Sequence, residues 1–490
     1  MKGKKPVIFL ILFLCMSFFL LGLLLNPFFG GKPKKGAEAN GKTAEKYTGV
    51  AYIKGTEAGM LEAEYWKRSD GDTLLFSEDE IASFNRNNRE FVLYRNEEGF
   101  ERRLREAEIG ERLSGQIVRS LLEEERIAQP ENGGISLYVN QSKVSDSYWE
   151  NLEMNRNLDA IDVGQERELR FAVCVEETVA MRAPTDDFVA DSVEEFYSND
   201  MVSSEVNIGE GVIVLHESRD GKWYYILNGS YCGWVHRETV AFCKNRAEWE
   251  KICNPERFLI VTGSKIVLDD TAVASTAAGR ILRMGTKLAL SDSAPDSVIG
   301  REPVGGYVVD FPAGDGEGNL FFEKVIVPVS LDVNIGYLCM TSDAVIRQAY
   351  KFLGQIYGYG GSFHSVDCSG MVRCVYSCFG MRLPRNSRAI AEMKDLGAFE
   401  CEKMSSAKKL SVLSELPGGL LLYMDGHLMI YLGMKDGKPY VISACADYIL
   451  SENAETVRHA NCVMVSGLDL LRKNGKSWLD SVCIIDWKEY

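Results

Sequence analysis

The residues best placed to do chemistry lie in one glycine-rich stretch, Tyr357–Gly370, with the sequence YGYGGSFHSVDCSG. It brings Asp367, Cys368 and Ser369 to the start of an apolar segment whose hydrophobic residues recur at spacings of three and four, which predicts a helix. A cysteine in the first turn of a helix lies at the positive end of the helix dipole, beside unpaired N–H groups. This position favours a thiolate and offers a place for a developing oxyanion, although a cysteine in an apolar segment is equally often an inert core residue.

A nucleophilic thiol needs a base within hydrogen-bond reach. The chain has only five histidines. His364 lies in the glycine-rich loop itself, whereas His427 begins a predicted strand directly after a tight turn at Asp425-Gly426. A side chain at that edge of a sheet can meet a helix-terminal thiol, so His427 is the better candidate for the base.

Several motifs, in their order along the chain, connect these two residues to a known family. YGYGG, DCSG, LPR-S and GHLMIYLG resemble the NlpC/P60 family of papain-like cysteine peptidases. The motifs around Arg182–Asp186, Gly209–Trp223 and Gly233–Val235 resemble the first bacterial SH3 (SH3b) barrel of multidomain members, and Phe258–Thr262 resembles the start of a second. Two further pairs of motifs resemble the helical N-terminal domain of these members: Gly59–Leu61 with Tyr65-Trp66, and Tyr148-Trp149 with Asn155–Asn157. The resemblance therefore spans residues 50–490.

The resemblance implies a role for each matching residue. Cys368 would be the nucleophile and His427 its base, and the third catalytic position, which orients the base, falls at Ser443, with His459 and Asn461 as alternatives. The implied substrate-binding residues are Tyr357, Tyr359, Asp367, Ser369, Asn386 and Ser387. Tyr359 stands where a tryptophan is usual, and Asn386 stands where an aspartate is usual. Because asparagine lacks the charge of aspartate, a contact from this position to a substrate ammonium would be weakened.

The implied reaction is cleavage of the γ-D-glutamyl bond to a diamino acid in peptidoglycan stem peptides or muropeptides, with the first barrel narrowing the cleft around a free N-terminal L-alanine. No cofactor is implied. A metal site is not expected either, because the thirteen cysteines include no C-x-x-C pair and Cys374 with Cys378 has no histidine partner. The formal charge of −15 and pI near 5.1 argue against nucleic acid as a partner.

The chain of 490 residues is long enough for several domains. Lys2, Lys4 and Lys5 precede an uncharged apolar run, Val7–Leu25, that nearly matches a bilayer-spanning helix. We expect an uncleaved membrane anchor with the body outside the cytoplasm, the alternative being secretion after signal cleavage.

The expected fold is multidomain: a transmembrane helix, a mostly helical domain, two small SH3-like β-barrels and a C-terminal α+β domain of the papain-like type. The predicted boundaries are 1–31 for the anchor, 32–46 for a linker, 47–165 for the helical domain, 166–245 and 246–340 for the two barrels, and 341–490 for the catalytic domain.

Two other functions stay open at this level. One is a cell-wall-binding protein whose barrels grip peptidoglycan and whose last domain is a weakened or inactive peptidase, with the short, uncharged Ser443 as its best evidence. The other is acyl transfer through the same thiol intermediate, because water and an amine compete for one acyl-enzyme.

Overall fold

The computed structural model describes residues 49–69, 71–88, 90–96, 98–124, 137–269, 271–293, 295–450 and 456–486. The predicted anchor (1–31) and linker (32–46) lie outside these ranges. No helix within the described ranges is long and apolar enough to cross a membrane. From Tyr52 onward the chain forms one compact unit.

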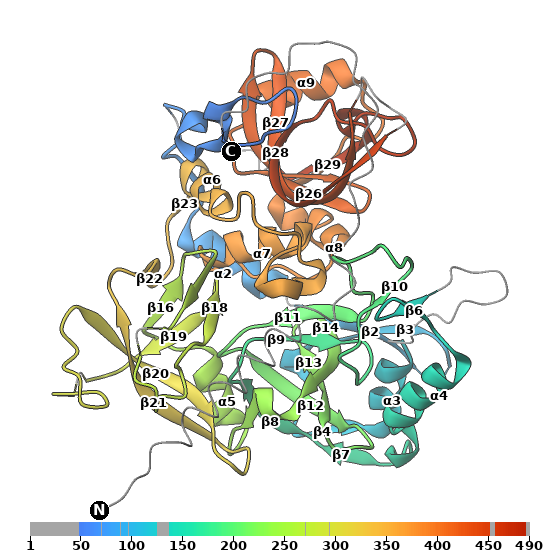
Figure 1. Cartoon of the computed structure of the whole chain (residues 1–490), viewed down its shortest axis with the longest axis vertical. Coiled ribbons are helices and arrows are strands. Elements are labelled where there is room, and N and C mark those ends of the chain that lie inside the picture. Colours follow the sequence, from blue (N-terminus) through green and yellow to red (C-terminus); the bar gives the residue numbers. More distant parts are fainter. Residues whose placement is uncertain are drawn as a thin grey trace, which may run out of the picture. The chain divides into compact units, whose positions relative to one another are not determined.

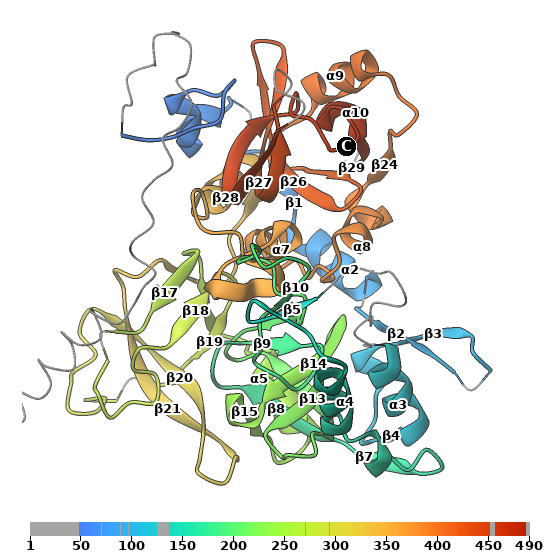
Figure 2. The same ribbon diagram turned by 45° about the vertical axis from the view of Figure 1, so that its right-hand side comes forward.

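The C-terminal part combines helices with one antiparallel sheet, and most of its helices precede the long strands (Figures 1 and 2). Its antiparallel sheet has the order β24-β29-β25-β26-β27-β28. The strands are β24 (Ala398–Glu400), β25 (Leu421–Met424), β26 (His427–Lys435), β27 (Lys438–Ile449), β28 (Val457–Gly467) and β29 (Val482–Asp486). The helices are α6 (Ser342–Tyr350), α7 (Cys368–Ser377), α8 (Ser387–Ala391), α9 (Ser406–Glu415) and α10 (Trp478–Ser481).

Local sequence explains the centre of this sheet. Asp436 and Gly437 both have positive φ, 50° and 74°, which matches the two-residue hairpin between β26 and β27. The apolar stripe of α7 is buried, including Met371, Val372 and Val375, and the helix packs on β26 and β27. The hairpins therefore fix the strands against which the Cys368 helix lies.

The first barrel is a seven-stranded antiparallel sheet with the order β11-β9-β14-β13-β12-β8-β15. Its strands are β8 (Arg170–Cys174), β9 (Thr178–Met181), β11 (Val202–Val206), β12 (Gly211–Glu217), β13 (Trp223–Asn228), β14 (Tyr231–His236) and β15 (Val240–Phe242). Asp220-Gly221 lies in the turn between β12 and β13, and Gly229 begins the turn between β13 and β14.

Helix α5 (Arg246–Cys253) leads from this barrel to a second β region. Its five-stranded sheet has the order β21-β20-β19-β16-β22, and β17 pairs with β18 separately. The strands are β16 (Phe258–Val261), β17 (Lys265–Val267), β18 (Ile281–Arg283), β19 (Lys287–Leu290), β20 (Gly306–Gly314), β21 (Leu320–Pro328) and β22 (Val333–Ile335). The assignment of this region to the SH3 type stays a prediction.

The structure does not show the predicted helical N-terminal domain. Helices α2 (Glu78–Asn87), α3 (Gly115–Glu124) and α4 (Asp146–Asn155) alternate with short strands. These strands are β1 (Leu74–Phe76), β2 (Val92–Arg95), β3 (Glu101–Leu104), β4 (Arg112–Ser114), β5 (Tyr138–Val139), β6 (Ser142–Lys143) and β7 (Glu166–Glu168). The charge-rich segment after Glu98 begins as strand β3 because it pairs with β2 across a turn at Gly99, where φ is 81°. Cross-strand pairing outweighs the helix propensity of its Glu and Arg residues.

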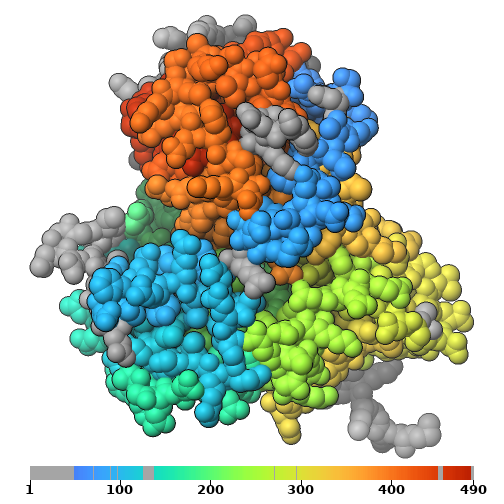
Figure 3. All heavy atoms as spheres, turned by 180° about the vertical axis from the view of Figure 1, so that it is seen from behind, coloured from blue at the N-terminus to red at the C-terminus, as the bar shows by residue number. Residues whose placement is uncertain are grey.

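The N-terminal segment is also divided between two cores. Trp66, Phe76 and Phe84 pack into the core of the C-terminal part, and β1 pairs with β23 (Met340–Thr341). From Val92 onward, the buried residues instead join the core of the first barrel. Figure 3 shows the early segment, in blue, against the orange C-terminal part. The single predicted domain 47–165 is therefore not one packing unit.

Candidate active site

Cys368 is the first residue of α7, as the sequence predicted. Asp367 caps the helix: its carboxylate accepts hydrogen bonds from the Gly370 N–H at 2.8 Å and from the Gly360 N–H at 2.9 Å. An N-cap aspartate satisfies helix N–H groups that have no partner of their own. The second bond ties the glycine-rich loop to the same carboxylate, so one side chain fixes both the loop and the helix start.

The glycines of this loop are required by close contact with the first barrel. Gly360 and Gly361 have φ values of 62° and 93°, which L side chains rarely adopt. A Cβ atom at Gly360 would lie 2.4 Å from the Val202 side chain, and one at Gly361 would lie 2.5 Å from that of Glu205. Strand β11 of the barrel is therefore packed directly against the loop that precedes the cysteine.

A buried chain of charges joins the barrel to the helix cap. The Arg385 guanidinium pairs with the Asp367 carboxylate and lies 3.3 Å from Glu205, which also pairs with Arg373 of α7 at 2.6 Å. Burial alone would raise the pKa values of Asp367 and Glu205. Arg385 together with other groups, namely the N–H donors to Asp367 and the Arg373 guanidinium beside Glu205, lowers both. Both carboxylates are therefore ionised and hold the cysteine helix in place.

His427 is the first residue of β26 and is held on two sides. Its Nε2 lies 3.0 Å from the Ser443 Oγ on β27, which is fully buried. The Trp478 ring contacts the imidazole edge-on, with the ring centres 5.2 Å apart. The Nε2–H can donate to the serine hydroxyl, which leaves Nδ1 as the free acceptor.

The two alternatives to Ser443 point elsewhere. His459 pairs through Nδ1 with Asp447 at 2.7 Å. Asn461 contributes its backbone carbonyl, which accepts from the Tyr357 N–H at 2.8 Å. Neither is hydrogen-bonded to His427.

Cys368 and His427 line one cavity of about 440 Å³, together with Tyr357. The other predicted substrate-binding residues lie outside its lining. Ser369 donates to Asp367 and accepts from Arg385 at 2.7 Å. The Tyr359 hydroxyl faces Arg182 of the first barrel at 3.5 Å.

Asn386 is the N-cap of α8, and its side-chain oxygen accepts from the N–H groups of Arg388 and Ala389. Ser387 follows it as the first residue of that helix. An asparagine here keeps the capping function of the usual aspartate while losing its charge.

The expectation that the thiolate is favoured is wrong for the free protein. Burial raises the pKa of Cys368 to about 11, and the neighbouring Asp367 carboxylate adds to the rise. Backbone N–H groups of Leu428 and Ser369 lower this pKa only in part. Burial also lowers the pKa of His427 to about 4, helped by the charge of Arg472. At neutral pH the resting pair is an uncharged thiol and an uncharged imidazole.

Comparison with known proteins identifies this region. The NlpC/P60 family profile matches residues 354–458, which include Cys368, His427 and Ser443. The chain contains an NlpC/P60 domain. A profile described as SH3 domain (SH3b1 type) matches residues 194–236, within the first barrel. No curated protein matches the chain.

Two solved structures are similar to the chain. An NlpC/P60 endopeptidase from Photobacterium damselae subsp. piscicida is 16% identical with a TM-score of 0.65, over 86% of this chain and 95% of that one. An NlpC/P60 family protein from Bacillus cereus ATCC 10987 is 15% identical with a TM-score of 0.42, over 64% of this chain and 98% of that one. The first likeness shows that the two proteins share a fold over most of this chain.

One support of the loop before Cys368 had no signal in the sequence. Arg283 of β18, buried and paired with Glu177 at 2.5 Å, donates to the loop carbonyls of Ser365, at 2.6 Å, and Gly361. His364 also contacts Glu177, so it belongs to this junction and not to the cavity with the thiol. Both β regions therefore support the loop before Cys368.

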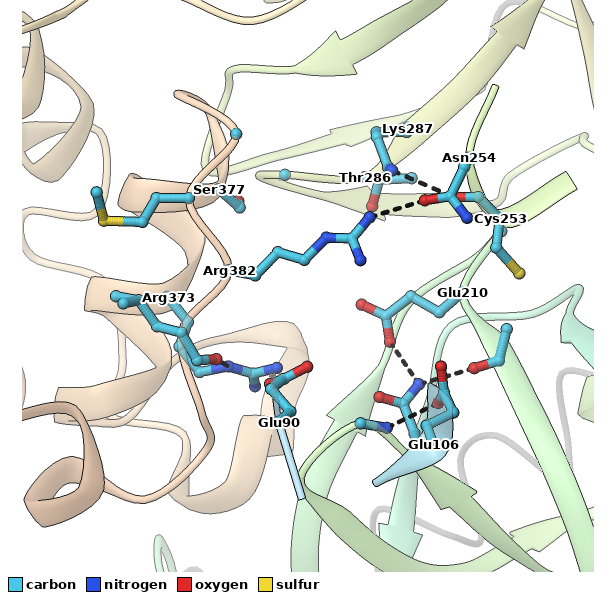
Figure 4. A pocket seen from close by; sticks show the side chains of 18 of the residues that line it. Glu90, Glu106, Glu210, Cys253, Asn254, Thr286, Lys287, Arg373, Ser377 and Arg382 are labelled. Atoms are coloured by element: carbon cyan, nitrogen blue, oxygen red, sulfur yellow. Dashed lines mark hydrogen bonds between the residues drawn. The ribbon is translucent and has the colours of Figure 1, made fainter. Parts of the chain in front are cut away.

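A second cavity, of about 270 Å³, lies at the other end of α7 and is walled by Ser377, both β regions and the N-terminal segment (Figure 4). Its charged groups already have protein partners. Arg382 donates to Asn254 at 2.8 Å, Lys287 to the Cys253 carbonyl at 3.2 Å, and Glu106 accepts from the Gly229 N–H at 3.0 Å. Burial raises the pKa of Glu106. These contacts make the cavity a polar junction between parts of the chain.

Proposed function

We propose that the protein is a cysteine endopeptidase that cleaves the γ-D-glutamyl bond to a diamino acid in peptidoglycan stem peptides or muropeptides. One observation carries the proposal: within an NlpC/P60 domain, a thiol at a capped helix start and an imidazole bonded to a buried serine line the same cavity. The SH3b domain beside it supports a substrate from the cell wall. We further propose that the segment Val7–Leu25 anchors the body outside the cytoplasm.

The proposed mechanism starts from the uncharged pair. His427 takes the thiol proton as Cys368 Sγ attacks the γ-carbonyl carbon of D-glutamate, so charge forms only along the reaction path. The N–H groups of Ser369 and Leu428, which lie beside the sulfur, are the donors available to the oxyanion. The imidazolium then gives its proton to the amine of the departing diamino acid, and water hydrolyses the thioester.

The test uses the full chain with L-Ala-γ-D-Glu-L-Lys as substrate. Cys368→Ala removes the nucleophile and should abolish release of lysine. Cys374→Ala is the matched control, because Cys374 is a buried cysteine of the same helix that does not line the cavity. A Cys368→Ala protein that hydrolysed the substrate at the rate of the Cys374→Ala protein would refute the proposal.

The second candidate is a cell-wall-binding protein with an inactive peptidase domain, favoured by the raised pKa of the Cys368 thiol. In that case the unchanged protein would bind peptidoglycan and release no diamino acid. Product analysis with added amines separates hydrolysis from acyl transfer, since transfer would give a new γ-amide of D-glutamate in place of a free γ-carboxylate.

A further inference from the structure

A hairpin next to the candidate active site carries a cation whose charge is not balanced by the described part of the chain. The turn closes through bonds between Arg472 and Lys476 and between Gly475 and Arg472, both 2.9 Å, and Leu471 binds the end of β27 at Ile449. The hairpin then leads into Trp478, which contacts His427. Arg472 is half-buried and lines the same cavity as Cys368 and His427.

The other charged groups of this cavity are accounted for. Asp447 pairs with His459 at 2.7 Å and lies 3.7 Å from the Lys473 Nζ. Asp425 lies in an exposed turn. Among the residues that the structure describes, no carboxylate lies within ion-pairing distance of Arg472. Its charge nevertheless reaches the base, because it helps to lower the pKa of His427.

A half-buried guanidinium beside a reaction centre suits a carboxylate ligand, since its planar N–H groups match the two carboxylate oxygens. The buried Arg385 cannot serve in this way, because Asp367 and Glu205 already occupy it. The proposed substrate has carboxylates on both sides of the scissile bond: the α-carboxylate of D-glutamate and that of the diamino acid.

The positions of the residues distinguish the two sides. Asp367, Ser369 and Arg385 lie outside the lining of this cavity, next to β11 of the first barrel, where the acyl part of the substrate is expected. Arg472 lies in the cavity with the base, which must reach the departing amine. We propose that Arg472 binds the carboxylate of the departing diamino acid and so selects substrates that carry one. This inference rests on the proposed function.

The experiment compares three substrates: L-Ala-γ-D-Glu-L-Lys, the same peptide with a lysine α-carboxamide, and the same peptide with an α-carboxamide on D-glutamate. The parent protein should show a kcat/KM for the free lysine carboxylate roughly 10- to 100-fold above that for the lysine carboxamide, the range of a charge-assisted hydrogen bond. In Arg472→Gln this ratio should fall to about one, and in Arg472→Lys it should keep an intermediate value. Lys476→Gln is the control, since Lys476 is in the same hairpin but outside the cavity lining, and should keep the full ratio.

A general loss of folding would lower all three rates together and leave the ratio intact. An Arg472→Gln protein that kept the parental lysine ratio would overturn the proposal. The proposal would also be overturned if Arg472→Gln instead lost the preference for a free α-carboxylate over an α-carboxamide on D-glutamate. Arg472 would then bind the carboxylate of the acyl part of the substrate.

A binding experiment makes the test independent of turnover. Calorimetry would measure the affinity of the same three peptides, which stay uncleaved, for Cys368→Ala and for the double variant Cys368→Ala, Arg472→Gln. If the parent protein cleaved nothing, the proposed function would fail. A carboxylate preference in binding that still depended on Arg472 would then support this inference alone.

Discussion

The bond between His427 and Ser443 allows the sharpest test of the site. Ser443→Ala removes a hydroxyl that lies 3.0 Å from Nε2 in a fully buried position. The Nε2–H then loses its protein acceptor, and the imidazole loses one of its two lateral contacts. Leaving a buried donor unsatisfied costs about 1–3 kcal/mol.

The effect on the rate depends on whether the lost hydrogen bond stabilises the transition state. If the bond holds the base for the transition state, kcat/KM should fall roughly 5- to 150-fold, since about 1.4 kcal/mol corresponds to a factor of ten. The assay is release of the diamino acid from L-Ala-γ-D-Glu-L-Lys under conditions in which the substrate is far below KM. Saturation curves that extend above KM should then separate kcat from KM, because loss of orientation lowers kcat more than it raises KM.

The same sheet offers a matched control. Ser466 on β28 is equally buried, and its Oγ has no hydrogen-bond partner among the described residues. Ser466→Ala therefore makes the same change in volume without breaking a bond, and it should leave kcat/KM unchanged. If Ser443→Ala and Ser466→Ala had indistinguishable activities, the reasoning that Ser443 orients the base would be refuted.

Three further predictions concern the Glu205 and Glu106 carboxylates and the Cys368 thiol. Glu205→Gln leaves Arg373 and Arg385 without their shared buried carboxylate, and the free energy of unfolding should fall by about 3–5 kcal/mol in denaturant titrations. Glu106→Gln should raise the melting temperature at pH 7 but not below pH 4. The pKa of Glu106 is raised by folding, so its carboxyl group makes folding less favourable only when the pH is above the pKa of that group in the unfolded chain. Alkylation of Cys368 by iodoacetamide in the free protein should keep accelerating up to pH about 11, above the range of a free thiol.

Each of these can fail clearly. An unchanged denaturation midpoint for Glu205→Gln would show that the two arginines find other partners. Stabilisation by Glu106→Gln that persisted below pH 4 would point to packing in place of charge. The alkylation rate of Cys368 can be followed by peptide mass mapping. A rate that stopped rising below pH 7 would show a preformed thiolate.

Much of the catalytic domain could be predicted from sequence because its signals are local. The apolar stripe after Cys368, the capping Asp367 and the turns at Asp425-Gly426 and Asp436-Gly437 act within a few residues, so the sequence predicts the helix start and the hairpin that carry Cys368 and His427. Ser443 could be named only through family resemblance. Its bond to His427 depends on the register of β26 against β27.

The failures of prediction involve contacts between segments far apart in the chain. The mostly helical domain expected over 47–165 contains paired strands such as β2 and β3, and it is divided between two cores. The reactive thiolate expected at the helix N-terminus is offset by burial and by the adjacent Asp367. A sequence pattern does not report how deeply a side chain will be buried.

The sequence by itself determined which side chains could serve as nucleophile and base, because these depend on residue type and on local turn and helix signals. Only the tertiary structure decided how they are supported. Glu205 and Arg283, from the two β regions, reach the cysteine helix and its loop, and Arg472 enters the cavity from a hairpin beyond the last long strand pair. These contacts join residues that are distant along the chain, and only the packed fold brings their charges together.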